Sequence, residues 1–233
     1  MLAAVVALFY TTLVVAQGDE REKKNIVGSG KIITKEVPVK SFDELSADGL
    51  FNLVLIQGDK EGVKIEADDN LMDFFEVTNE GSRLQIRMKD KDVSFDTKEK
   101  SLKVYVSFRK LKTLDLKMVG NTSAEGQLSF DNLTINNKSV GNTDLKLSVQ
   151  KLDIQNKGVG NVKLSGKGDD VVISNKGVGN IVASNFVTQK MNIENTGVGN
   201  AEVNAEKELK VKDSFLGKVK NHGAAPVRKK VSS

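Results

Sequence analysis

The tripeptide Val-Gly-Asn recurs five times in the second half of the chain, at Val119-Gly120-Asn121, Val140-Gly141-Asn142, Val159-Gly160-Asn161, Val178-Gly179-Asn180 and Val198-Gly199-Asn200. A degenerate sixth copy, Leu216-Gly217-Lys218, follows, and successive glycines lie 18 to 21 residues apart. A fixed period of about 20 residues is typical of proteins built from stacked structural repeats.

Apolar residues occupy fixed places around each glycine. Eight residues before it stand Leu133, Leu152, Val171, Met191 and Leu209, and six before it stand Ile135, Ile154, Ile173, Ile193 and Val211. Four residues after it stand Ala124, Leu145, Leu164, Ala183 and Val203. Polar residues alternate with these positions, which is the periodicity of a β-strand. Each unit is therefore expected to be a strand, a glycine turn and a second strand.

Such units bury their apolar faces only against neighbouring units, so they must stack. The pattern predicts an all-β protein, a right-handed parallel β-solenoid (β-helix) over residues 117–222, preceded by an irregular β-rich N-terminal part. The absence of proline between Pro38 and Pro226 agrees, since proline removes a donor from a sheet ladder.

Glycine and asparagine have columns of their own. Glycine accepts a positive φ in a tight turn, which is the structural role expected for Gly120, Gly141, Gly160, Gly179, Gly199 and Gly217. Asparagine follows the glycine at Asn121, Asn142, Asn161, Asn180 and Asn200, and precedes it by four residues at Asn137, Asn156, Asn175 and Asn195. We expect these amides to bond the local backbone and to form ladders between units. The alternative is a row that faces carbohydrate or an ion.

The first half, residues 27–116, also has β character but lacks the glycine-asparagine signature. Apolar runs occur at 50–56, 63–67, 84–88, 102–108 and 114–118. Residues 69–75 are expected to be a single helical turn or a loop. The rival interpretation of this half is a separate small β-sandwich.

Residues 1–16 carry no charge and end in Val14-Val15-Ala16, which predicts a secretory signal peptide. A polar linker is expected at 17–26 and a basic tail at 223–233. We expect an exported protein, in the periplasm, on the cell surface or secreted, with no transmembrane span once the signal is removed.

Composition excludes much chemistry. The 233 residues include no cysteine and a single histidine, so thiolate catalysis and Cys- or multi-His metal sites are not expected. Lys and Arg number 35 against 31 acids, interspersed, which does not favour nucleic-acid binding. No catalytic residue, metal ligand or cofactor is predicted.

The remaining candidates have ordinary interpretations. His222 has no predicted partner, and the doublets Asp68-Asp69 and Asp169-Asp170 are interpreted as solvated loop acids because neighbouring strand residues point to opposite faces. The run from Gly28 to Lys31 lacks the spacing of a phosphate loop and is interpreted as a flexible entry. Arg228-Lys229-Lys230 is interpreted as a solvated end.

Three first-half stretches, followed by the glycine-asparagine repeats, resemble a known family. They are the run from Val27 to Gly30, Ser41-Phe42 with the run from Ala47 to Gly58, and the run from Val63 to Leu71. Together they resemble the exported bacterial head GIN domain proteins, also named auto-transporter adhesins and domain of unknown function 2807. The resemblance implies a two-part, all-β, solenoid-like fold and an adhesin role in the Bacteroidetes envelope. It offers no catalytic residues.

These observations predict a non-enzymatic envelope or cell-surface protein that acts as an adhesin-like binding or scaffolding module for carbohydrate or protein. Two alternatives stay open. One is a polysaccharide lyase or hydrolase that works in a solenoid groove, and the other is a purely structural, self-assembling envelope protein. The oligomeric state is left open.

Overall fold

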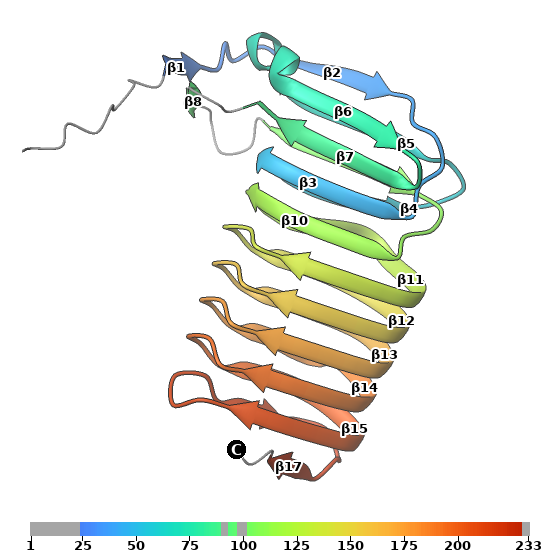
Figure 1. Ribbon diagram of the computed structural model, residues 1–233, viewed down its shortest axis with the longest axis vertical. Coiled ribbons are helices and arrows are strands. Elements are labelled where there is room, and N and C mark those ends of the chain that lie inside the picture. Colours follow the sequence, from blue (N-terminus) through green and yellow to red (C-terminus); the bar gives the residue numbers. More distant parts are fainter. Residues whose placement is uncertain (1–23, 90–92, 97–101, 230–233) are drawn as a thin grey trace, which may run out of the picture.

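The computed structural model describes residues 24–89, 93–96 and 102–229, and most of these residues are in strands (Figure 1). The prediction of an all-β chain is confirmed. Within the described residues the only helix is the short 3-10 helix η1 (Asp69–Phe74), at the position expected for a helical turn. No described helix is long and apolar enough to cross a membrane. The predicted signal, residues 1–16, lies outside the described residues.

Short strands make up the first half of the chain and long strands the second. The first half contains β1 (Lys24–Val27), β2 (Ile32–Val37), β3 (Glu44–Leu50), β4 (Asn52–Gln57), β5 (Gly62–Asp68), β6 (Phe75–Glu80), β7 (Arg83–Met88), β8 (Val93–Asp96) and β9 (Lys103–Phe108). The second contains β10 (Thr113–Val119), β11 (Thr122–Asn137), β12 (Thr143–Asn156), β13 (Val162–Asn175), β14 (Ile181–Asn195), β15 (Ala201–Asp213), β16 (Val219–Asn221) and β17 (Val227–Lys229).

Strands β11 to β15 stack in parallel, one above the other (Figure 1). The register follows the sequence repeat, so that Leu133 pairs with Leu152, Leu152 with Val171 and Val171 with Met191. The turn valines pair in the same way, from Val119 to Val198. Residues of one sequence column therefore lie on top of one another.

Each long strand bends in its middle and so belongs to two walls. The first residues of β11 pair with β4, and its last residues pair with β10. One wall continues from β10 through β3 and β7 to β6, and the other continues from β4 through β9 and β5 to β2. Strands of both halves of the chain thus belong to one mixed sheet of 15 strands.

The core lies between the two walls. The columns six and eight residues before the glycine are buried in every unit from Leu133 to Val211. They join Leu45, Leu84 and Val104 of the first half in one apolar cluster. Burial of each such Leu, Ile or Val side chain contributes about 1.5 to 3 kcal/mol to folding.

Two expected unstructured segments are partly ordered. The end of the linker expected at 17–26 lies in β1, which pairs in parallel with β8. The residues expected to begin the basic tail continue the stack, since Ala225 is buried and its amide donates to the carbonyl of Ala205 at 2.9 Å. Strand β17 then pairs with β15.

The turn glycines approach the preceding unit closely. Gly160 has a φ of +129°, and a Cβ added to it would overlap the carbonyl oxygen of Gly141. Gly120, Gly141, Gly179 and Gly199 also have positive φ and a carbonyl in the same place. The positive φ expected for Gly217 is wrong, since Gly217, in the degenerate sixth copy, does not have one.

Replacing Gly160 by Val is expected to destabilise the protein by more than about 4 kcal/mol, because strain at positive φ adds to a clash with backbone that cannot move. Gly126→Val is the matched control, since Gly126 also has a positive φ but has open space around it. The control should cost only about 1 to 3 kcal/mol. Urea unfolding measures both, and equal losses would contradict the close-approach account.

Candidate functional site

A groove of about 860 Å³ lies at the bend of the stack, where strands β11 to β13 pass from one wall to the other. Its floor includes Phe130 and Val149. Side-chain amides and hydroxyls line much of the rest, at Gln57, Thr113, Ser129, Asn132, Thr134, Ser148 and Gln150. The arrangement offers hydrogen-bonding groups at regular strand spacings along an open channel.

One end of the groove is fixed by Gln57 on β4. Its amide oxygen accepts from the Ser129 N–H at 2.6 Å, and its amide nitrogen donates to the Ser129 carbonyl at 2.9 Å. Nitrogen Nε2 also lies 3.3 Å from the carbonyl oxygen of Arg109. These bonds join residues 52 and 72 positions apart in the sequence, so no local sequence pattern predicts them.

Four cations line the groove, and two of them are paired. The Nε of Arg109 lies 2.8 Å from Glu61, and the Nζ of Lys112 lies 2.6 Å from Asp43. The hydrogen bond from Arg109 holds the pKa of Glu61 below its ordinary value, and Lys112 does the same for the pKa of Asp43. Lys110 and Lys167 make no ion pair with another described residue.

Two carboxylates also reach the groove. Asp131 and Asp169 occupy the same column two units apart, about 10 Å by strand spacing. Gln150 lies between them and donates to Asp131 at 3.2 Å. Asp170 is exposed but does not line the groove.

The inner asparagine column is buried and continuous. The Nδ2 of Asn137 donates to the Oδ1 of Asn156 at 2.8 Å, Asn156 donates to Asn175 at 2.7 Å, and Asn175 donates to Asn195 at 2.6 Å. This series of side-chain hydrogen bonds ends at Asn195, which donates to the carbonyl of Gly199. All four side chains are at most 4% exposed.

The outer asparagine column is exposed and bonds to backbone. Each Oδ1 accepts the N–H of the next asparagine in the column, at 2.8 or 2.9 Å, from Asn121 to Asn200. Sequence reasoning missed the first member, Asn52, whose Oδ1 accepts the N–H of Asn121. Phe51 takes the place of glycine in that turn, so only an apolar-x-Asn pattern could have indicated it.

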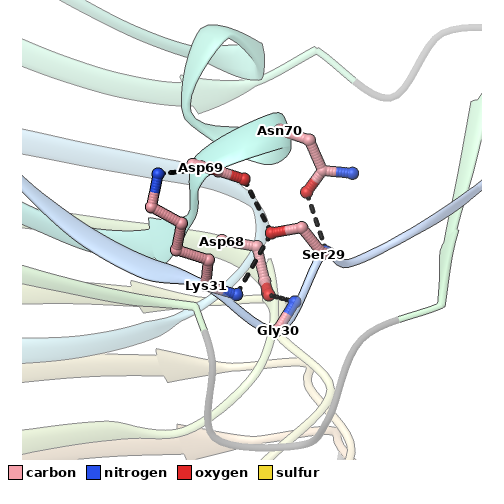
Figure 2. Close-up of polar contacts among 6 residues, drawn as sticks. All are labelled: Ser29, Gly30, Lys31, Asp68, Asp69 and Asn70. Carbon is pink, nitrogen blue, oxygen red and sulfur yellow. Dashed lines mark hydrogen bonds and ion pairs between the residues drawn. The ribbon is translucent and has the colours of Figure 1, made fainter.

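The interpretation of Asp68 as a solvated acid is wrong, since it is 3% exposed. Its Oδ1 accepts the N–H of Gly30 at 2.7 Å (Figure 2). Asp69 accepts from the Ser29 hydroxyl at 2.6 Å and pairs with Lys31 at 3.2 Å. The run from Gly28 to Lys31 is therefore held by β5 and η1 and is not a free entry.

The other candidates from the sequence are not brought together. His222 lies 3.3 Å from Glu202, and Lys229 lies 3.4 Å from Asp213. No group of three or more His, Cys, Asp or Glu side chains with the geometry of a metal site occurs in the part of the chain that the structure describes.

Comparison with known proteins finds a family and several similar structures. A family model described as "Putative auto-transporter adhesin, head GIN domain" matches residues 41–225. A crystal structure of a "putative adhesin" from Bacteroides fragilis is similar at 30% identity and a TM-score of 0.75, over 88% of this chain and 99% of that chain.

Two further structures, both called a "putative adhesin", share the fold at lower identity. The one from Parabacteroides distasonis has 22% identity and a TM-score of 0.64, over 89% of this chain and 96% of that chain. The one from Parabacteroides merdae has 20% identity and a TM-score of 0.61, over 89% of this chain and 100% of that chain. No curated protein matches the chain.

Replacing Asn156 by Ala should lower the free energy of unfolding by about 2 to 4 kcal/mol, because buried amide groups of Asn137 and Asn175 lose their partners. Asn161→Ala in the exposed column should cost only about 1 kcal/mol, since water can replace the lost bond. Urea unfolding of both variants is the measurement. A larger loss for Asn161→Ala would contradict the ladder.

The Ser29 hydroxyl and the Lys31 ammonium hold the pKa of Asp69 below its ordinary value of 3.8. A lowered pKa means that the contact stabilises the protein above pH about 4 and that this contribution is lost as the pH falls through the lowered pKa. The protection factors for hydrogen exchange at residues 28–31, which correct for the intrinsic pH dependence of exchange, should therefore fall at low pH. Asp69→Asn should have low protection factors at every pH, and an unchanged pH profile of protection in that variant would contradict the assignment.

Proposed function

This chain belongs to the head GIN domain family, and from that membership we propose that it is an exported, adhesin-like binding module of the bacterial envelope without enzymatic activity. The uncharged segment 1–16 supports export. The ligand that we propose is a carbohydrate chain, bound along the groove at the bend.

The observation that carries the proposal is the lining of that groove. Amides and hydroxyls from Asn132, Ser148 and Gln150 line it, beside two unpaired lysines and two carboxylates. A sugar chain presents hydroxyls at regular intervals, and a binding site for it needs a few placed polar groups over an apolar floor. The two unpaired lysines are balanced by Asp131 and Asp169 in the same lining, so the charge of the groove does not select an acidic carbohydrate.

We also propose that the stack is a right-handed parallel β-solenoid over 117–222, with the β-rich part at 27–116 as its continuous first section. Parallel strands of one sheet are joined by right-handed connections in nearly all proteins. The structural roles of the turn glycines and asparagine columns belong to this proposal, because a coil that repeats in register needs the same backbone at every turn.

A glycan array followed by calorimetry tests the binding proposal. The double variant Asn132→Ala/Gln150→Ala should lose at least about tenfold in affinity for the glycan found, because it removes two of the polar groups in the groove. The matched control is Asn185→Ala/Gln189→Ala, which removes the same groups from one unit that does not line the groove. Equal losses in both variants, or no glycan bound, would overturn the proposal.

The same samples test the enzymatic alternative. Asp131 and Asp169 in the groove are the carboxylates that such an enzyme would use. New reducing or unsaturated ends in the bound polysaccharide, abolished by Asp131→Asn, would show a lyase or hydrolase instead. Light scattering that rises with protein concentration, without any ligand, would favour the self-assembling alternative.

A further inference from the structure

The turns at the other edge of the stack form a surface of unusual composition. We define the valine face as the turn segments 117–121, 138–142, 157–161, 176–180 and 196–200, with 214–218 at its end. In Figure 1 the turns after β11 to β14 stand above one another along one side of the stack. Each valine pairs with the valine of the next unit in a parallel β-bridge, and the pairing runs through Val119, Val140, Val159, Val178 and Val198.

The valines are exposed although they are apolar. Their exposed fractions lie between 47% and 52%, and Leu216 continues the row with 58%. Phe215, beside it, is 91% exposed. At a strand spacing of about 4.8 Å, the row from Val119 to Leu216 is about 24 Å long. A continuous apolar row of this length marks an interaction surface more often than a free one.

The charges of the valine face are all positive. Its six segments contain Lys117, Lys138, Lys157, Lys176 and Lys218 and no Asp or Glu, although the chain as a whole has 35 basic and 31 acidic residues. Lys117, Lys138, Lys157 and Lys176 are exposed and stand in one column. None of these four makes an ion pair with another described residue.

Acids near this column pair with other cations. Asp115, two residues before Lys117, pairs with Arg83 at 3.0 Å, and Asp144 pairs with Lys163 at 2.9 Å. Asp48 is the register neighbour of Lys117 and makes no ion pair with it. Like charges at strand spacing repel one another, so the column favours an anionic partner.

A groove of about 890 Å³ borders the first turns of the valine face. Its lining includes Leu50, Val119 and Val140, together with the aromatic rings of Phe95 and Tyr105. The apolar character of the face therefore continues into a hollow at its N-terminal end.

We propose that the valine face docks on an anionic lipid bilayer. Apolar side chains that enter the boundary between headgroups and acyl chains, beside lysines that reach the headgroup phosphates, are the chemistry of interfacial membrane binding. An anionic sugar polymer would pair with the lysines but would leave Phe215 and Leu216 in water. It therefore explains the charge of the face but not its exposed apolar side chains. The groove at the bend stands at another edge of the stack and stays open to solvent.

Vesicle co-sedimentation tests the proposal with the chain from residue 17 onward, without the predicted signal peptide. The wild type should bind vesicles of phosphatidylcholine mixed with phosphatidylglycerol and should bind pure phosphatidylcholine far more weakly. The triple variant Lys138→Gln/Lys157→Gln/Lys176→Gln should bind the anionic vesicles roughly a hundredfold more weakly, since each lysine contributes about a factor of five. Phe215→Ser should weaken binding about tenfold without unfolding, because Phe215 is exposed.

The matched control is Lys146→Gln/Lys151→Gln/Lys190→Gln, which removes the same charge from exposed lysines outside the valine face. It should bind nearly as well as the wild type. Equal loss in the control, no binding to either vesicle, or binding to soluble anionic polysaccharide with none to vesicles would each overturn the proposal. The groove variant Asn132→Ala/Gln150→Ala should keep vesicle binding, so this result is independent of the proposed glycan site.

Discussion

Successive turns in this protein approach so closely that the carbonyl oxygen of one glycine occupies the space that a Cβ on the next would need. This contact sets the register of the whole stack. The first part of each strand, between the turn and the groove, absorbs differences in repeat length: the two extra residues of the first repeat are taken up between Ser123 and Gln127, and Gly126 there has a positive φ. The turns are thus constant, and the length of this part varies.

Because the register is constant, asparagine has two different structural roles in the stack. Asparagine four residues before the glycine points inward, and its amides bond from unit to unit in a buried chain. Asparagine just after the glycine points outward and holds the next backbone N–H. Both columns join neighbouring units without any cysteine in the chain. A buried amide without its partner would be costly, so the inner column also penalises any slip in register.

The same division separates the two surfaces that carry the functional argument. At the bend the sequence differs from unit to unit, and a groove with mixed amides, hydroxyls and charges results. At the turns the sequence is nearly the same in every unit, and the repeated valines and lysines form a uniform, positively charged surface. Because stacking in register places each side chain next to its copies in the neighbouring units, the charge or apolarity of one residue type extends along the whole column.

The sequence by itself determined the repeat, its strands, its buried apolar columns and the places of the turn glycines. It could do so because units that stack in register need the same residue types at the same positions. It also indicated the family through the order of the first-half motifs. Only the tertiary structure decided that Asn52 begins the outer column, that Asp68 is buried against Gly30, and that Gln57 reaches Ser129 to close the groove. These contacts join segments 38 to 72 residues apart, outside the repeat. Which residues meet in these contacts depends on how the irregular first strands pair with the two walls, and no local sequence pattern predicts that pairing.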